Sequence, residues 1–239
     1  MRAVAERAAL PAHIGIIMDG NGRWARQRGQ RRTEGHRAGI RAIRRVMEAA
    51  DRAGVHHLTL FAFSTENWSR PRYEVATLMR LFEQTLQEEV DELHQNGVRI
   101  RVIGRRERLS ARLCRLVEEA EARTRENARG ALNVAINYGG RAEIVDAVRS
   151  LARAGQDLRQ LDEEMLAAHL YTAGLPDPDL IIRTAGELRT SNFLIWQAAY
   201  AELYVTQTLW PDFGAADLEA ALADYAVRVR RFGGVPELD

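Results

Sequence analysis

Short apolar runs of strand length alternate along this chain with longer segments of helical periodicity. The runs lie at 14–18, 58–63, 98–103, 132–136, 180–182 and 203–206. The segments between and after them predict helices at 35–52, 73–95, 106–126, 141–154, 192–199 and 216–231. This alternation favours a mostly parallel sheet with helices on both faces. The 239 residues contain no linker-like stretch, so we expect a single α/β domain with about six strands.

The first apolar run ends in Asp19, and residues 20–23 (Gly-Asn-Gly-Arg) follow at once. A strand that leads through glycines into a helix presents backbone N–H groups to an anion. A carboxylate at this place would repel a diphosphate unless a divalent cation lay between them. The segment therefore predicts a metal–diphosphate site at Asp19, with Arg32 close enough to contribute a charged contact.

A dinucleotide site is the main alternative for this turn, because residues 20–25 also fit the loose pattern G-x-G-x-x-A. Two features count against it. Asp19 would face the pyrophosphate of the cofactor without a metal, and no acidic residue ends the second run to hold a ribose. Backbone N–H groups around a metal-bound diphosphate remain the better interpretation.

A second anion site is predicted after the fifth run, where Arg183, Arg189 and Ser191 follow one another. Ser191 alone would serve equally well as the N-cap of the helix expected at 192–199. Because the carboxyl ends of parallel strands meet at one edge of the sheet, both anion sites should lie there. Two arginine-rich anion sites indicate two phosphorylated substrates, which favours a transferase over a hydrolase.

Composition excludes several classes of chemistry. All 34 basic residues are arginine, which excludes Schiff-base lysines and the P-loop lysine. The net charge of +1 excludes a broad basic field, so we expect no nucleic-acid partner. The single cysteine, Cys114, excludes an intrachain disulfide and a cysteine cluster for zinc. The first ten residues do not resemble a signal peptide and no apolar run could span a membrane, so we expect a cytoplasmic protein.

Motifs spread over nearly the whole chain resemble those of the cis-prenyltransferases, and most closely those of the bacterial undecaprenyl diphosphate synthases. They lie at 13–25 (HIGIIMDGNGRWA), 35–39 (GHRAG), 58–70 (LTLFAFSTENWSR), 137–141 (NYGGR), 179–184 (DLIIRT), 187–193 (ELRTSNF), 201–204 (AELY), 209–212 (LWPD) and 230–234 (RRFGG). One departure is Ala185, where the family has glycine. The resemblance implies a homodimeric, Mg²⁺-dependent enzyme that condenses an allylic diphosphate with successive isopentenyl diphosphate units to make new cis double bonds.

The resemblance also implies roles for individual residues. Asp19 and Glu202 would hold the Mg²⁺, and Asn67 would assist proton removal. The allylic diphosphate would be surrounded by Gly20, Asn21, Gly22, Arg23, Trp24, Arg32 and His36. From the residues alone, His36 fits a solvated histidine as well as a phosphate ligand. The isopentenyl diphosphate would be held by Arg183, Arg189, Thr190 and Ser191. A mobile loop would position the substrates through Ser64, Thr65, Glu66, Trp68 and Arg70.

The product would be undecaprenyl diphosphate built on farnesyl diphosphate, a carrier-lipid precursor for cell-wall synthesis, with a peripheral membrane contact for its release. Its chain would lie in an apolar tunnel, for which the candidates are Leu58, Leu60, Val134, Ile136, Leu86 and Val90. The small Ala62 indicates a medium or long product. Residues 1–12 are expected to form an N-terminal arm. The tail at 230–239 is expected to reach the partner subunit through residues 231–233.

Three alternatives remain open. One is a cis-prenyltransferase with a different product length. A non-catalytic partner subunit of the same fold is disfavoured because Asp19 and the diphosphate-binding residues are all present. A metal-dependent phosphohydrolase is disfavoured because the sequence lacks further clustered carboxylates or histidines for a two-metal site.

Overall fold

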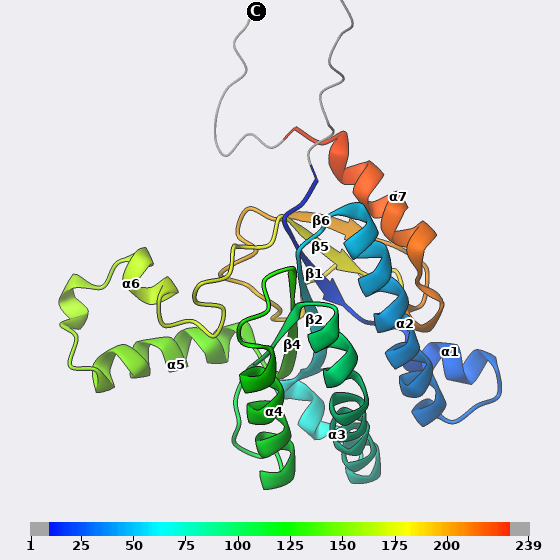
Figure 1. Cartoon of the computed structure of the whole chain (residues 1–239), viewed down its shortest axis with the longest axis horizontal. Helices are drawn as coiled ribbons and strands as arrows, with labels where there is room; N and C mark the ends of the chain where they lie inside the picture. The colour runs from blue at the N-terminus through cyan, green and yellow to red at the C-terminus, as the bar shows by residue number, and fades with distance from the viewer. Residues whose placement is uncertain (1–9, 230–239) are drawn as a thin grey trace, which may run out of the picture.

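Six parallel strands form one sheet in the order β3-β4-β2-β1-β5-β6 (Figure 1). This computed structural model describes residues 10–229. The strands are β1 (His13–Ile17), β2 (His57–Ser64), β3 (Val98–Ile103), β4 (Gly130–Tyr138), β5 (Leu180–Arg183) and β6 (Glu202–Val205). All six predicted strands are confirmed, and so is the α/β fold.

The helices are α1 (Asn21–Gln27), α2 (Arg32–Ala53), α3 (Arg72–Gln95), α4 (Ala111–Thr124), α5 (Gly140–Arg153), α6 (Glu163–Ala167) and α7 (Ala215–Ala226). Three short 3₁₀ turns join them: η1 (Thr65–Ser69), η2 (Leu158–Gln160) and η3 (Trp210–Asp212). Five of the predicted helices are present. The last one ends at Ala226 and is therefore shorter than the predicted 216–231.

The helix predicted at 192–199 is wrong. Ser191, Asn192 and Leu194 have left-handed backbones with φ of 50°, 66° and 45°, so the segment forms turns instead. Its apolar residues Phe193 and Leu194 are nevertheless fully buried, because the turns press them against one face of the sheet. The alternative interpretation of Ser191 as a helix N-cap is therefore excluded.

Small side chains of α2 bring that helix close to the sheet. Ala42, Val46 and Ala50 are buried against β1 and β2, together with Leu218 and Leu222 of α7. Helix α3 continues this layer through Val75 and Leu78, which pack on Phe63 and Ile136. Helix α4 lies along β3, the edge strand, where Thr124 accepts the N–H of Ile100 and Glu121 accepts that of Val102. These bonds protect a strand edge that would otherwise be free.

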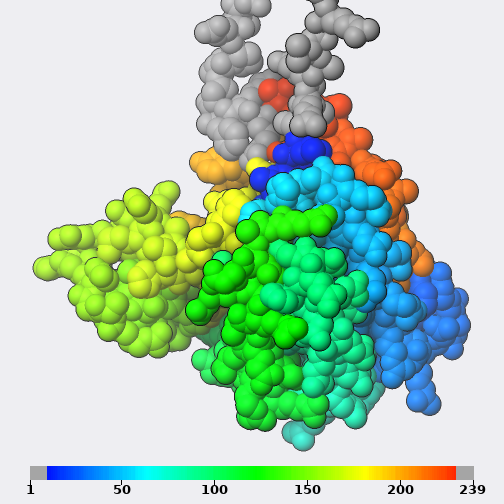
Figure 2. All heavy atoms as spheres, in the orientation of Figure 1, coloured from blue at the N-terminus to red at the C-terminus, as the bar shows by residue number. Residues whose placement is uncertain are grey.

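The opposite face of the sheet is covered mainly by the segment around Phe193 and not by a regular helix. Helices α5 and α6 project from the body on this side and share a small core of their own (Figures 1 and 2). At the amino end of the strands, the buried ring of His13 contacts Pro176 O through Nδ1 and Thr59 Oγ1 through Nε2, each at 2.7 Å. Burial lowers the pKa of His13 to about 4, so the ring is neutral at pH 7.

We expect His13 to make the fold acid-sensitive. The unfolded chain binds a proton at this ring near pH 6.5 and the folded chain does not, so stability is complete above pH 6.5 and is lost as the pH falls toward 4. The expected loss is about 3 kcal/mol in the free energy of unfolding. Urea unfolding at several pH values measures it. The pH dependence should become shallower in His13→Gln, where the part that His36 contributes remains, and should be unchanged in a variant of the exposed His94. An unchanged profile in His13→Gln would contradict this account.

Two glycines of α2 allow the chain after β1 to lie directly on this helix. A Cβ at Gly35 would lie 2.0 Å from the carbonyl oxygen of Asn21, and one at Gly39 would lie 2.4 Å from Asn21 Oδ1. This close contact positions the predicted diphosphate turn against α2.

Gly35→Ala is therefore expected to destabilise the protein by about 3 kcal/mol, because the added methyl group meets backbone atoms that cannot move aside. Denaturant unfolding measures the loss. Gly155→Ala is the control, since no described atom lies within 4 Å of a Cβ there and only its φ of +73° opposes alanine. That control should lose about 1 kcal/mol; equal losses in the two variants would refute the steric explanation.

Within residues 10–229, no helix has the length and apolarity needed to cross a bilayer. Most of the predicted N-terminal arm and the whole of the predicted C-terminal tail at 230–239 lie outside the described residues.

Candidate active site

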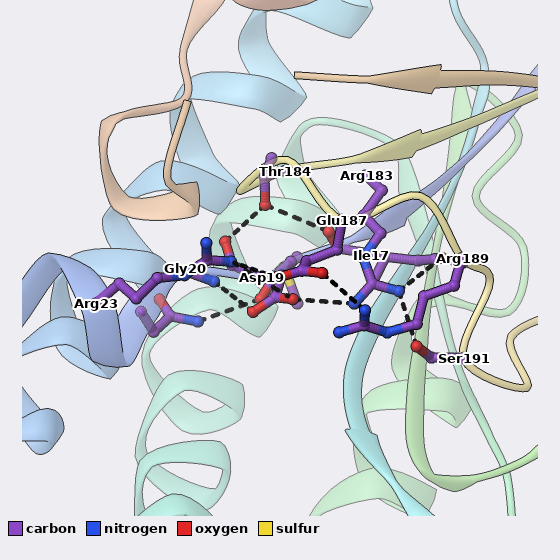
Figure 3. Close-up of polar contacts among 11 residues, drawn as sticks. Ile17, Asp19, Gly20, Arg23, Arg183, Thr184, Glu187, Arg189 and Ser191 are labelled. Carbon is purple, nitrogen blue, oxygen red and sulfur yellow. Dashed lines mark hydrogen bonds and ion pairs between the residues drawn. The ribbon is translucent and has the colours of Figure 1, made fainter. Parts of the chain in front are cut away.

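The site lies where β1 and β5 run side by side, the point at which the strand order changes direction. Ligands of open α/β sheets bind beyond the carboxyl ends of the strands at such a point. Asp19 follows β1 and Arg183 ends β5, and Arg183 Nη2 lies 2.9 Å from Asp19 Oδ2. The sheet therefore brings together the two anion-site residues that the sequence separates by more than 160 positions (Figure 3).

Asp19 is held by contacts on both sides of its strand. Its Oδ1 accepts the N–H of Gly20 at 2.7 Å, and its carbonyl oxygen accepts bonds from the Thr184 hydroxyl and the Trp210 N–H. Arg23 Nη2 lies 4.0 Å from Oδ2. The Asp19 side chain is still 35% exposed, so the carboxylate is fixed in place yet accessible from the site.

Arg183 is the buried centre of the second anion group. Its Nη1 donates to the carbonyl oxygen of Arg189 at 2.6 Å and to Ser191 Oγ at 2.7 Å, while Nη2 contacts Asp19. The side chain is 4% exposed, and its buried Nε has no partner within residues 10–229. Arg189 itself is exposed and pairs with Glu187 at 2.7 Å. Thr190, the fourth residue predicted for this group, takes part through its backbone, because its carbonyl oxygen accepts the N–H of Phe193.

Glu187 joins the two anion groups. One carboxylate oxygen pairs with Arg189, and the other lies 3.9 Å from Arg23 (Figure 3). Ion pairs through Asp19 and Glu187 therefore link Arg23 of the first anion group to Arg183 and Arg189 of the second. The carboxylates of Asp19 and Glu187 offset the repulsion between these like charges.

A third carboxylate lies among the remaining predicted ligands of the allylic diphosphate and of the loop after β2. Glu74, in the first turn of α3, lies 3.3 Å from Arg32 Nη2, 3.3 Å from Arg70 Nη1 and 3.7 Å from His36 Nε2. Burial, and after it the nearby Arg70, lower the pKa of His36 to about 4. His36 is therefore a neutral ring at pH 7, able to exchange a hydrogen bond with phosphate without adding charge.

The glycines of the turn make room for neighbouring groups. Gly20 has a φ of +106°, and a Cβ there would lie 3.0–3.1 Å from atoms of Leu209 and Ala185. A Cβ at Gly22 would lie 3.2 Å from Nε of Arg32, so this glycine lets the guanidinium rest over the start of α1. Ala185 has a left-handed backbone with a φ of 73°, a conformation that glycine adopts more readily than alanine.

The loop after β2 is tied to the same edge of the sheet. Asn67 Oδ1 accepts the N–H of Ser64, which closes the η1 turn. Trp68 donates its indole N–H to Asn137 at 2.7 Å, and Glu66 accepts from Asn192 at 3.1 Å. Thr65 lies against Gly139, where a Cβ would be 2.7 Å from its Oγ1.

A cavity of about 910 Å³ begins beside Asn21 and His36 and continues between α2, α3 and the strands β2 to β4. This volume is near the upper end of the about 300–1,000 Å³ typical of ligand pockets. Leu60, Ala62, Val134, Ile136 and Leu86 line it, as predicted for a tunnel. Leu58 and Val90 are not among its described lining residues, and Leu58 packs in the core under α2.

Comparison with known proteins identifies the family. Residues 17–233 match the prenyltransferase family model described as "Putative undecaprenyl diphosphate synthase". The isoprenyl transferase of Heliobacterium mobile is 54% identical over 95% of this chain and 88% of its own, and that of Clostridium perfringens is 50% identical over 95% and 91%. The chain belongs to the undecaprenyl diphosphate synthase family of prenyltransferases.

Two solved structures of this family's fold are similar throughout. Lavandulyl diphosphate synthase from Lavandula x intermedia, in complex with dimethylallyl diphosphate, superposes with a TM-score of 0.89 at 38% identity, covering 94% of this chain and 98% of that one. A probable undecaprenyl diphosphate synthase from Campylobacter jejuni gives 0.79 at 32%, covering 95% and 100%. The prediction of a cis-prenyltransferase-like fold and family is thereby confirmed.

The family's motif residues do not all gather at the site. Glu202 begins β6 at the opposite end of the sheet from Asp19, and its carboxylate pairs with Arg228 at 2.7 Å. Within one chain, the parallel strands carry Glu202 and Asp19 to opposite ends of the sheet, so the structure does not bring these two residues together. The prediction that Glu202 helps to hold the metal stays a prediction. Trp24 donates its indole N–H to Asp212, and the guanidinium of Arg28 stacks on its ring. The Trp24 side chain therefore contacts Asp212 and Arg28 of the same chain.

The residues fit a single Mg²⁺ that relies on its substrates. Asp19 offers an accessible carboxylate between two groups of arginines, and no cluster of three or more acidic, histidine or cysteine side chains exists in residues 10–229. Mg²⁺ commonly binds one or two carboxylates and completes its coordination with substrate phosphates and water. Asp19 is the residue that would hold the ion here.

Sequence reasoning missed the counter-charges of this prenyltransferase site. Glu187 lies inside the motif at 187–193, which predicts no role for it, and Glu74 lies in a long helix whose pattern indicates core packing. The only available signal for Glu74 was a carboxylate in the first turn of α3, four residues after Arg70. Asn137 and Asn192, which anchor the η1 loop, carry no signal of their own beyond the motifs that contain them.

Proposed function

We propose that this prenyltransferase condenses an allylic diphosphate with successive isopentenyl diphosphate units and makes a polyprenyl diphosphate with new cis double bonds. The observation that carries the proposal is the pairing of two arginine groups around Asp19, which lies next in sequence to Met18, a lining residue of the 910 Å³ cavity. Two charged head groups would bind at the rim, and one apolar chain would extend inward.

The allylic diphosphate would bind at the turn after β1, against Arg23, Arg32 and Arg70. Loss of this diphosphate from the allylic carbon builds negative charge on the leaving group. Fixed guanidinium groups and backbone N–H groups stabilise that charge without having to reorganise. When bound, Mg²⁺ would neutralise further charge on the same oxygens. The solved relative with dimethylallyl diphosphate supports a head group of this class.

The isopentenyl diphosphate would bind at Arg183, Arg189 and Ser191, on the other side of Asp19. Buried Arg183 would fix its position, and its unpartnered Nε is a donor free for this purpose within the described chain. Asn67 Oδ1 already accepts the N–H of Ser64. Asn67 would therefore assist proton removal indirectly, by orienting the loop and a diphosphate oxygen or a water molecule. An Asn67→Ala variant with normal turnover would remove Asn67 from this step.

The proposed primer is farnesyl diphosphate, and the proposed product is undecaprenyl diphosphate for cell-wall carrier lipid. The size of the cavity, its apolar lining and the small Ala62 support a medium or long chain. We further propose that the protein works in the cytoplasm as a homodimer and releases its lipid through a peripheral contact with the membrane. Sedimentation of the full chain, alone and with vesicles, tests both associations.

The function is tested by incubating the protein with farnesyl diphosphate, radiolabelled isopentenyl diphosphate and Mg²⁺, and by separating the products chromatographically. We expect a long polyprenyl diphosphate, and no elongation once the metal is chelated. Elongation that stops at a shorter product would favour a family member of different product length. No elongation by the chain alone would favour a partner subunit, and phosphate release without elongation would favour a phosphohydrolase.

A further inference from the structure

Glu74 is a buried carboxylate that none of the proposed chemical steps uses. Its side chain is 2% exposed, although it lies at the rim of the diphosphate site. A buried carboxylate is strongly unfavourable unless cations compensate it. Arg32 and Arg70 do so, each with one guanidinium nitrogen 3.3 Å from Glu74 Oε1.

The groups around Glu74 come from separate elements of the fold. Arg32 and His36 belong to the first turns of α2, and Arg70 ends the η1 loop directly before α3. Glu74 thus connects α2 to the start of α3 through one oxygen atom. Two guanidinium groups drawn to one atom would repel each other without it, because they carry like charges within a few ångströms.

The arrangement also contains a group without a partner. Nε2 of His36 is buried, lies 3.7 Å from Glu74, and makes no hydrogen bond within the described part of the chain. The cavity begins at this ring and at Asn21, whose buried Oδ1 likewise has no described partner. Unsatisfied polar atoms of this kind indicate a place for a polar ligand group.

We propose that Glu74 is a positioning residue for the allylic diphosphate: its carboxylate holds Arg32, Arg70 and His36 in the geometry that receives the anion. This inference rests on the proposed function. Glu74 touches no substrate atom; it acts through the side chains that do. Rigid support of this kind determines how well a site is preorganised. The second anion group of the protein, formed by Arg183 and Arg189, does not depend on Glu74.

The test compares Glu74→Gln with Glu83→Gln in the full-length protein. Glu83 lies on the same helix, about 13 Å further along. Its side chain is 16% exposed and contacts Ser110 and Arg112, so the matched variant loses the same charge away from the site. Binding of inorganic pyrophosphate without metal is measured by calorimetry, and KM is measured for each substrate. Circular dichroism confirms that both variants fold.

We expect Glu74→Gln to weaken pyrophosphate binding and raise the allylic KM by about tenfold, because a charged hydrogen-bonded pair is lost. The KM for isopentenyl diphosphate should change less than about twofold, and Glu83→Gln should resemble the wild type. Glu74→Asp keeps the charge but shortens the side chain. It should also bind pyrophosphate several-fold more weakly if position matters, and it serves as the test if Glu74→Gln does not fold.

Two results would overturn the proposal. Tighter pyrophosphate binding by Glu74→Gln would show that the carboxylate merely neutralises the arginines. Equal increases in both KM values, or the same changes in Glu83→Gln, would show a general loosening of α3. Failure of the wild type to elongate would refute the proposed function instead, and the pyrophosphate comparison would still decide the role of Glu74.

Discussion

Replacing Asp19 by alanine is expected to lower the rate of chain elongation about a thousandfold, which corresponds to about 4 kcal/mol of transition-state stabilisation. Asp19 is the carboxylate fixed between the two arginine groups, and Thr184, Trp210 and Gly20 hold it there. Without it the ion would lose its protein ligand, and the two diphosphates would face each other unscreened. Incorporation of labelled isopentenyl diphosphate measures the rate.

The control for this prediction is Asp157→Ala. Asp157 is an acidic residue outside the site that pairs with Arg159 at 2.9 Å, and its replacement should leave the rate unchanged. Asp19→Asn separates charge from shape, because asparagine keeps the size of the side chain. We expect it to be nearly as slow as Asp19→Ala and to bind Mn²⁺ weakly in electron paramagnetic resonance titrations. Elongation by either Asp19 variant within tenfold of the wild type would refute the metal role.

Arg183→Gln is expected to raise the KM for isopentenyl diphosphate about a hundredfold. The buried guanidinium joins Asp19, Ser191 and the carbonyl of Arg189, so its loss removes the anion ligand and also loosens the loop that follows β5. The KM for the allylic diphosphate should rise much less, because the allylic diphosphate is proposed to bind on the other side of Asp19 from Arg183. Initial rates at varied concentrations of each substrate give both values.

Arg189→Gln is the comparison variant for this second prediction. Its side chain is 58% exposed and, within residues 10–229, pairs with Glu187 alone, so its loss should raise the same KM by about tenfold or less. Arg159→Gln, outside the site, should change neither KM. A similar KM for isopentenyl diphosphate in the wild type and Arg183→Gln would show that the second diphosphate binds elsewhere.

The meeting of Asp19 and Arg183 was predictable because it follows from topology. Each residue ends an apolar run, and parallel strands place their carboxyl ends on one edge. The sequence does not contain the strand order itself, so the direct neighbourhood of β1 and β5 became visible only in the structure. The same reasoning, applied to Glu202, would have placed it at the other end, because it begins its strand.

The features that sequence analysis missed depend on tertiary contacts. The sequence does not show that Glu74 is buried while other acids of α3 are exposed, because its burial depends on the packing of α2 against α3. The segment 192–199 has helix-compatible residues, yet it forms turns in which Phe193 and Leu194 are buried against the sheet and the backbones of Asn192 and Leu194 are left-handed. In both places long-range packing overrides the local pattern.

The central claim is that one metal at Asp19 serves two diphosphates on neighbouring strands. A crystal structure of the protein with Mn²⁺, isopentenyl diphosphate and an unreactive thio-analogue of farnesyl diphosphate tests it most directly. The account predicts a single anomalous peak at the Asp19 carboxylate, with one diphosphate on Arg23 and Arg32 and the other on Arg183 and Arg189. Metal bound away from Asp19, or both diphosphates on the same arginine group, would contradict it.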